Sequence, residues 1–312
     1  MPMRFHYLLY FCVASYSGGD FFTPMNARPT NATVRASFNL LPNAQDDLAT
    51  QEFFPVKQSA SPLPQAHAHN DYEHSRPLFD ALEQGFVYIE ADVYLIDGEL
   101  YVSHLYPLVL SQEKTLVHSY LAPLAELVRR NGGSVFSTPD APPLQLMVDI
   151  KSDANETYAA LKKHMEPYQH LLTSFENGVK NERAVTVFLS GNRPVEQVLS
   201  EEKTFMCLDG RIEDLGRGIP PDLMPVVSER FSNIFGWEIL GQQRTENQWL
   251  TLKRLACLTH SEGKKLRLWA SPETESVWEE MLNAGCDIIN SDELHRLRQF
   301  LLRRSLAQVA AH

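Results

Sequence analysis

The stretch Phe86-Val-Tyr-Ile-Glu90-Ala-Asp92-Val-Tyr94 decides how the chain folds, because it combines a strand pattern with two acidic side chains. Successive side chains of a strand point to opposite faces. One face therefore carries the polar and aromatic set and the other the apolar set: Tyr88, Glu90, Asp92 and Tyr94 against Val87, Ile89, Ala91 and Val93. The strand thus presents two carboxylates side by side.

A helix pattern stands directly before this strand. Ser75 suits the N-cap, Pro77 lies in the first turn, and Gly85 ends the apolar face. After the strand, Asp97-Gly98 predicts a tight turn into a next strand that ends at His104. From Gln65 onward, short apolar runs keep alternating with helix-like segments, which is typical of a parallel sheet.

The strand count predicts the fold. Besides residues 65–69, 86–94 and 100–104, the strand candidates are Leu144–Ile150, Ala184–Leu189, Thr204–Leu208, Lys265–Ala270 and Cys286–Asn290, with Pro225–Ser228 ambiguous. Helical patterns separate most of them. About eight strands alternating with helices predict a single-domain (β/α)8 TIM-type barrel.

The predicted barrel spans residues 64–305, with a short tail at 306–312. Residues 18–63 are rich in Asn, Ser, Thr, Pro and Gln and predict a flexible, irregular N-terminal arm. Residues 1–17 hold a short apolar run after Arg4, which favours a signal peptide and the secretory pathway. A mitochondrial start is the alternative. The run is shorter than the roughly 20 residues that a transmembrane helix needs, so no membrane span is expected.

Composition narrows the possible partners. The formal net charge is −11, and no block of Lys and Arg offsets it, which argues against nucleic-acid binding. Four scattered cysteines make neither a disulfide framework nor a zinc site. The oligomeric state is left open.

The carboxylates predict a metal site. In a barrel of this type, catalytic groups stand at the carboxyl ends of the strands. Glu90 and Asp92 share a strand face, and burying them together without a cation is costly. Asp149, at the end of Val148-Asp149-Ile150-Lys151, completes an oxygen-rich set suited to Mg²⁺ or Ca²⁺. Lys151 is placed to contact a phosphate oxygen.

Histidines complete the expected chemistry. Cleavage of a phosphodiester needs a base for the attacking oxygen and an acid for the leaving oxygen, and imidazole titrates near neutrality. His67 and His104 end two predicted strands and are the candidates for these roles. His69 shares a face with His67, and we expect it, with Asn70, to contact the substrate.

Four motifs carry a family resemblance: His67-Ala-His-Asn-Asp-Tyr72, Ile89-Glu-Ala-Asp-Val93, Val102-Ser-His104 and Val148-Asp-Ile-Lys151. Together they resemble the phospholipase C-like phosphodiesterase superfamily, which includes glycerophosphodiesterases and sphingomyelinase D. The first motif is more closely similar to the altered inheritance of mitochondria protein 6 family of fungi.

The resemblance implies that Glu90, Asp92 and Asp149 hold the metal and that His67 and His104 act as acid and base. It also implies that Trp269 walls the pocket and that Asn290 reaches the phosphate. The implied activity is metal-dependent phosphoric diester hydrolysis of glycerophosphodiesters or (lyso)phospholipids. The first motif lacks the His-Arg-Gly of glycerophosphodiesterases, so the head group of the substrate stays open. The choice between hydrolysis and a cyclic phosphate product is open as well.

Two other functions compete. An amidohydrolase-like enzyme would bind a transition metal through His67 and His69, with Asp292 at the last strand. A non-catalytic barrel would keep the fold and bind a ligand only. Metal-dependent turnover separates the phosphodiesterase from the second alternative.

Overall fold

The computed structural model describes residues 60–138, 140–236 and 244–310. The possible signal peptide at 1–17 and nearly all of the predicted arm at 18–63 lie outside these ranges. Within them, the core is continuous from the first strand to the last helix.

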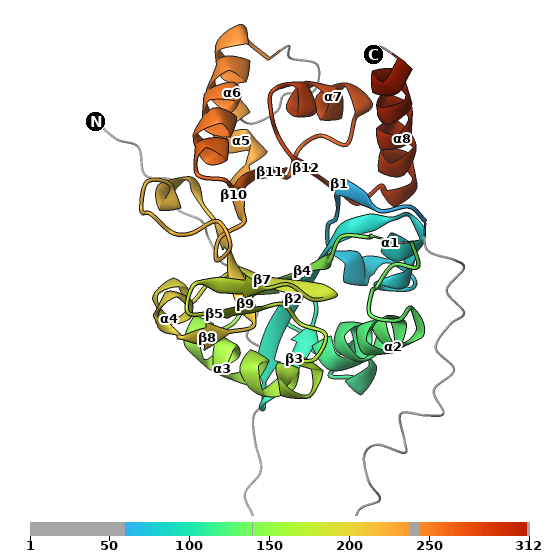
Figure 1. Ribbon diagram of the computed structural model, residues 1–312, viewed down its shortest axis with the longest axis vertical. Coiled ribbons are helices and arrows are strands. Elements are labelled where there is room, and N and C mark those ends of the chain that lie inside the picture. Colours follow the sequence, from blue (N-terminus) through green and yellow to red (C-terminus); the bar gives the residue numbers. More distant parts are fainter. Residues whose placement is uncertain (1–59, 139, 237–243, 311–312) are drawn as a thin grey trace, which may run out of the picture. The chain divides into compact units, whose positions relative to one another are not determined.

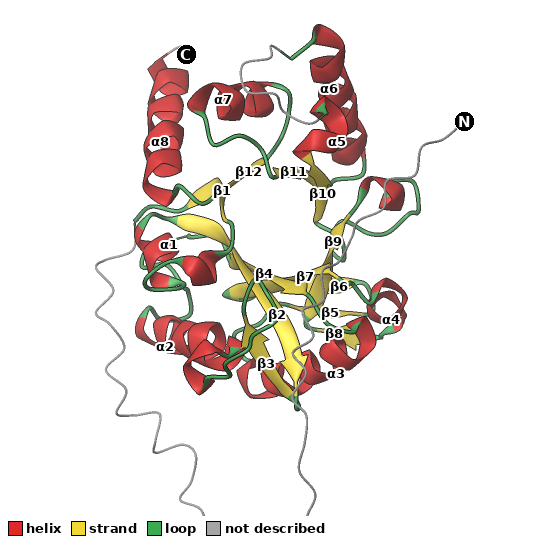
Figure 2. Ribbon diagram, turned by 180° about the vertical axis from the view of Figure 1, so that it is seen from behind, coloured by secondary structure: helices red, strands yellow, loops and turns green. Residues whose placement is uncertain are grey.

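Eight parallel strands close into a barrel, as predicted (Figures 1 and 2). The ring closes because β1 pairs in parallel with β12 on one side and with β2 on the other. The barrel strands are β1 (Leu63–Ala68), β2 (Phe86–Ile96), β4 (Leu144–Ile150), β7 (Val185–Gly191), β9 (Met206–Gly210), β10 (Val226–Arg230), β11 (Lys265–Trp269) and β12 (Ile288–Ser291).

Helices surround the barrel and bury its outer face (Figure 2). They are α1 (Phe79–Glu83), α2 (Ala122–Arg130), α3 (Ala154–Met165), α4 (Val195–Ser200), α5 (Phe231–Phe235), α6 (Glu246–Ser261), α7 (Glu275–Asn283) and α8 (Leu294–Ala310). α8 packs on β1 and α6 on β11. Across the described ranges, no helix has the length and apolar character that crossing a membrane requires.

One predicted barrel strand is not part of the ring. β3 (Glu99–Val102) pairs antiparallel with β2, from Ile96↔Glu99 to Val93↔Val102. Asp97 and Gly98 both adopt positive φ, at 51° and 83°, and such a two-residue turn returns the chain antiparallel to itself. The eighth place in the ring belongs instead to β10, the segment whose pattern was ambiguous.

A small second sheet was not predicted. It consists of β5 (Ser174–Glu176), β6 (Val179–Asn181) and β8 (Lys203–Thr204) in the order β6-β5-β8. Asn177 and Gly178 form its tight turn with positive φ values of 51° and 78°. These strands are two or three residues long, too short for side-chain alternation to indicate them.

Candidate active site

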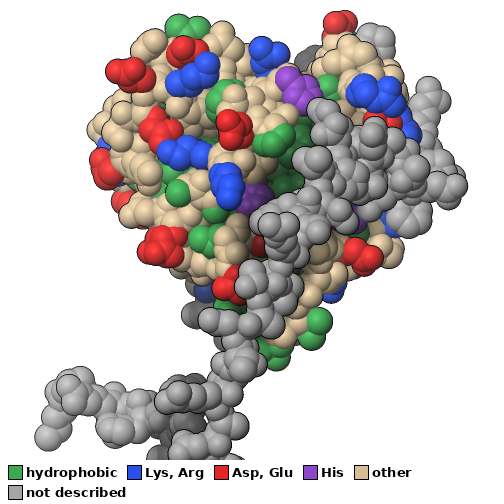
Figure 3. Space-filling model, turned by 90° about the horizontal axis from the view of Figure 1, so that it is seen from below, with side chains coloured by type: hydrophobic (Ala, Val, Ile, Leu, Met, Phe, Trp, Pro, Cys, Tyr) green, Lys and Arg blue, Asp and Glu red, His purple; other side chains and the backbone are tan. Residues whose placement is uncertain are grey.

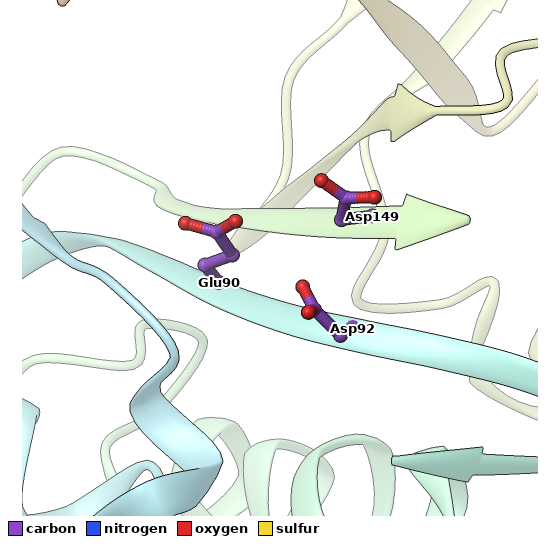
Figure 4. Close-up of side chains that lie close together, drawn as sticks. All are labelled: Glu90, Asp92 and Asp149. Carbon is purple, nitrogen blue, oxygen red and sulfur yellow. The ribbon is translucent and has the colours of Figure 1, made fainter. Parts of the chain in front are cut away.

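Three carboxylates meet inside the barrel. Glu90 and Asp92 project from β2, and Asp149 projects from β4, where it is the direct cross-strand partner of Asp92. Figure 4 shows the three side chains turned toward one another. An oxygen from each lies within 4.8 Å of the others. The structure thus brings together the three residues predicted to hold a metal.

Burial and neighbouring charges tune these carboxylates differently. Burial raises the pKa of Asp149 to about 6, and burial together with the Glu90 charge raises the pKa of Asp92. Burial alone would also raise the pKa of Glu90, but the hydrogen bond with His67 and the charge of Arg267 outweigh it and bring it to about 2. The negative charges of the three carboxylates therefore repel one another, and a cation beside them is favourable.

The ammonium of Lys151 partly answers this repulsion. Its Nζ lies 3.0 Å from Asp92 Oδ2 and 3.1 Å from Asp149 Oδ1. One more oxygen, Asp92 Oδ1, is buried without a hydrogen-bond partner among the described residues. An unpaired buried carboxylate oxygen is costly unless it binds a cation, so the donor set fits a hard divalent metal ion.

The β7 residue diagonal to Asp149 is a glycine. Gly191 ends β7 with φ +64°, and a Cβ there would stand 2.1 Å from Asp149 Oδ1. Any residue other than glycine would displace the Asp149 carboxylate from this position.

His67 is buried behind Glu90. It is fully buried, and its Nε2 is 3.0 Å from Glu90 Oε2. Burial and the nearby Arg267 charge lower its pKa to about 4, so the ring is neutral at pH 7. Its ring stacks on Tyr88 at a centroid distance of 6.1 Å.

Two other histidines are each paired with an aspartate. His69 Nδ1 lies 2.7 Å from Asp292 Oδ1. Burial lowers the pKa of His69, but this bond and the negative charges of Glu90 and Asp292 together outweigh burial and raise it. His104 Nδ1 lies 3.3 Å from Asp92 Oδ2. A carboxylate on one ring nitrogen orients the imidazole.

Asn70, Asp71 and Tyr72 fix the conformation of the loop after β1. Asn70 adopts the left-handed conformation at φ 45°. Buried Asp71 accepts hydrogen bonds from the Leu78 N–H at 2.6 Å and from the Tyr120 hydroxyl at 2.9 Å. These bonds hold the loop so that the Tyr72 hydroxyl lies 2.9 Å from Asp92 Oδ2.

A buried arginine joins the far side of the barrel to the carboxylates, and sequence reasoning missed it. Arg267 of β11 lies with Nη2 3.3 Å from Glu90 Oε2 and donates to Asn290 Oδ1 at 2.8 and 3.1 Å. It also donates to Ser228 Oγ at 3.1 Å. The available signal was a charged residue inside the apolar run Leu266-Arg-Leu268.

A second unpredicted cluster lies beside it. Asp209 of β9 is fully buried and accepts hydrogen bonds from Ser190 Oγ at 2.8 Å, Ser228 Oγ at 2.6 Å and Arg211 Nη1 at 2.6 Å. The pair places the Arg211 guanidinium at the edge of the site.

These groups surround a cavity of ≈ 400 Å³. Its walls include seven predicted residues: His69, Asn70, Glu90, His104, Asp149, Lys151 and Trp269. They also include four that were not predicted: Ser190, Asp209, Arg211 and Arg267. His67 and Asn290 lie behind the wall, where they bond to Glu90 and Arg267.

Comparisons with known proteins find one family and several relatives that are similar to this chain. Residues 56–207 match the model of the AIM6-like phosphodiesterase domain. The altered inheritance of mitochondria protein 6 homolog of Arthroderma benhamiae is 25% identical over 275 residues, which is 78% of this chain and 86% of that protein. The altered inheritance of mitochondria protein 6 of Saccharomyces cerevisiae strain YJM789 is 28% identical over 282 residues, 77% and 71% of the two chains.

A solved glycerophosphodiester phosphodiesterase from Parabacteroides distasonis covers 80% of this chain and 100% of its own, with 11% identity and a TM-score of 0.46. The matched residues 56–207 contain Glu90, Asp92, Asp149 and all three site histidines. Residues 56–207 are therefore similar to the AIM6-like phosphodiesterase domain, the family that the sequence motifs resemble.

Proposed function

We propose that this protein is a divalent-metal-dependent phosphoric diester hydrolase. The observation that carries the proposal is the convergence of Glu90, Asp92 and Asp149 on one point, with a buried oxygen of Asp92 left unpaired. These three residues would hold Mg²⁺ or Ca²⁺. When bound, the ion would polarise a phosphoryl oxygen and offset negative charge that develops in the transition state.

Cationic side chains of the cavity would bind the phosphate. Lys151 and Arg211 both line the wall, as does part of Arg267. A phosphodiester carries one negative charge, and guanidinium and ammonium donors recognise it by charge-assisted hydrogen bonds. Trp269 lines the same cavity and would cover an apolar part of the substrate.

Two imidazoles would move the protons. One takes the proton of the attacking hydroxyl, either water or a neighbouring hydroxyl of the substrate, and the other protonates the leaving oxygen. We assign these roles to His69 and His104, because both line the cavity and each is oriented by an aspartate. Buried His67 would instead position Glu90, in place of the acid or base role predicted from sequence.

The geometry supports the competing functions less well. A His-x-His metal site would need His67 and His69 to share one ion, yet their bonded nitrogens face different carboxylates, Glu90 and Asp292. A binding-only barrel would not need two paired imidazoles beside three carboxylates. Glycerophosphodiesters and lysophospholipids are the substrates we propose to test first.

The test is turnover by the purified full chain on glycerophosphodiesters, lysophospholipids and an aryl phosphodiester, with Mg²⁺, with Ca²⁺ and with chelator. We expect turnover that requires the metal and falls at least about a hundredfold in Asp149→Asn and in His69→Gln. Glu196→Gln, at an exposed helix position, is the isosteric control and should keep full activity. Turnover that persists in chelator, or no turnover on any diester, would refute the proposal.

A further inference from the structure

The segment that follows His104 is an exposed apolar loop. Residues 105–110 read Leu105-Tyr-Pro-Leu-Val-Leu110, and their large side chains are exposed, with Leu108 at 93% and Val109 at 82%. No Asp, Glu, Lys, Arg or His occurs between His104 and Glu113. Contiguous apolar exposure of this kind marks an interaction surface.

Packed side chains anchor both ends of the loop. At its start, the Tyr94 ring packs edge-on against Tyr106 at 5.6 Å, and the Tyr94 hydroxyl donates to the His104 carbonyl at 3.4 Å. At its end, buried Thr115 forms a bridge with Tyr101 of β3. The protrusion therefore rests on packed side chains at both ends.

The loop is also continuous with the active site. A cavity of ≈ 800 Å³ lies between the 72–77 segment and residues 102–105, and Leu105 lines it. His104 lines both this cavity and the cavity of the carboxylates. A molecule taken up at the loop would thus reach the metal-binding residues along one surface.

We propose that residues 105–110 insert into the interfacial region of a phospholipid bilayer and hold the His104 side of the site against lipid head groups. All five large side chains of the loop are exposed, from Leu110 at 44% to Leu108 at 93%. The surface of a second protein would cover one side, whereas lipid surrounds an inserted loop completely. The uncharged sequence and the tyrosine suit the apolar boundary beneath the head groups. The lipid-substrate part rests on the proposed function; bilayer binding does not.

The test measures binding of the full chain to sucrose-loaded phosphatidylcholine vesicles by co-sedimentation, in chelator so that no substrate turns over. We expect the wild type to bind and Leu108→Ser/Val109→Ser to partition about tenfold less or weaker still. The matched control is Leu306→Ser/Val309→Ser on α8, where the two side chains are 72% and 74% exposed. It should bind as the wild type does.

Two further readouts identify the partner. Because insertion is apolar and the chain is acidic, 1 M salt should not weaken binding, and a Val109→Trp reporter should shift to the blue and be quenched by brominated lipid. No binding by the wild type would overturn the proposal. Equal binding of the loop variant and the wild type to vesicles would also overturn it. So would a wild type that self-associates through the loop without binding vesicles, if the loop variant lost that self-association.

A last comparison separates this inference from the proposed function. With metal present, the loop variant should hydrolyse vesicle lipid about tenfold more slowly than the wild type and a soluble aryl diester at the same rate. Equal rates on vesicles would overturn the lipid-substrate part. Vesicle binding without hydrolysis of any diester would refute the proposed function and leave bilayer docking standing.

Discussion

At the scale of single residues, Asp71 connects the motif after β1 to the stability of the fold. Burial raises its pKa to about 7, although it accepts hydrogen bonds from Leu78 and Tyr120. The unfolded chain releases this proton near the reference pKa of about 3.9. Between these two values the folded state binds more protons, so the free energy of unfolding falls as pH rises through this window.

Asp71→Asn should remove this dependence, because the amide does not titrate. We expect the wild type to lose about 2–3 kcal/mol of unfolding free energy relative to the variant between pH 5 and pH 8. Urea unfolding curves at the two pH values measure the difference. Asp222→Asn, at an exposed position, is the control, and its unfolding free energy should change with pH as that of the wild type does. The same pH dependence in Asp71→Asn would show that Asp71 titrates normally.

Residues on one strand, or on neighbouring strands of predictable register, were the predictable part of the site. Glu90 and Asp92 share a strand face by alternation alone, and Asp149 follows from the register of neighbouring parallel strands. Arg267 could not be inferred in this way, because its partner Glu90 lies 177 positions away. The burial of His67 behind Glu90 likewise depends on how the barrel closes, which local patterns do not specify.

At the scale of elements, the β2–β4 pair and the end of β7 position the carboxylates. Gly191 is the part of this arrangement that sequence reasoning passed over, because one glycine at a strand end has no distinctive pattern. Its importance comes from a contact with Asp149, on the neighbouring strand.

Gly191→Ala tests this arrangement. Gly178→Ala is the matched control, because Gly178 also has positive φ, at +78°, but its added Cβ would meet no atom within 4 Å. We expect a loss of about 1 kcal/mol of unfolding free energy at Gly178 and about 3 kcal/mol or more at Gly191. Diester turnover should disappear only in Gly191→Ala. Equal stability losses with activity retained in both variants would contradict the assigned clash.

Element prediction succeeded where the pattern was long and failed where it was short. The eight-strand count was correct, but β3 took the place of β10 in that count. The Asp97-Gly98 turn already specified an antiparallel partner, so β3 could have been excluded by its turn alone. The pattern of β10 was weak because Ser228, Glu229 and Arg230 interrupt its apolar run.

At the scale of the whole molecule, closure of the barrel gathers the site from strands at opposite ends of the sequence. His69 follows β1, Arg267 lies in β11, and Asp292 follows β12. Basic and acidic side chains are interspersed on the described part of the face in Figure 3, which shows no uniformly basic patch.

The most direct test of the central claim is the number of divalent cations bound per chain, measured by equilibrium dialysis of the full chain against Mg²⁺, Ca²⁺ or Mn²⁺. Asp92→Asn and Asp149→Asn remove single ligands, and Glu196→Gln again serves as the control. The carboxylate site predicts one ion per chain in the wild type and the control, and none in either ligand variant. No bound ion in the wild type, or an ion that both ligand variants retain, would contradict it.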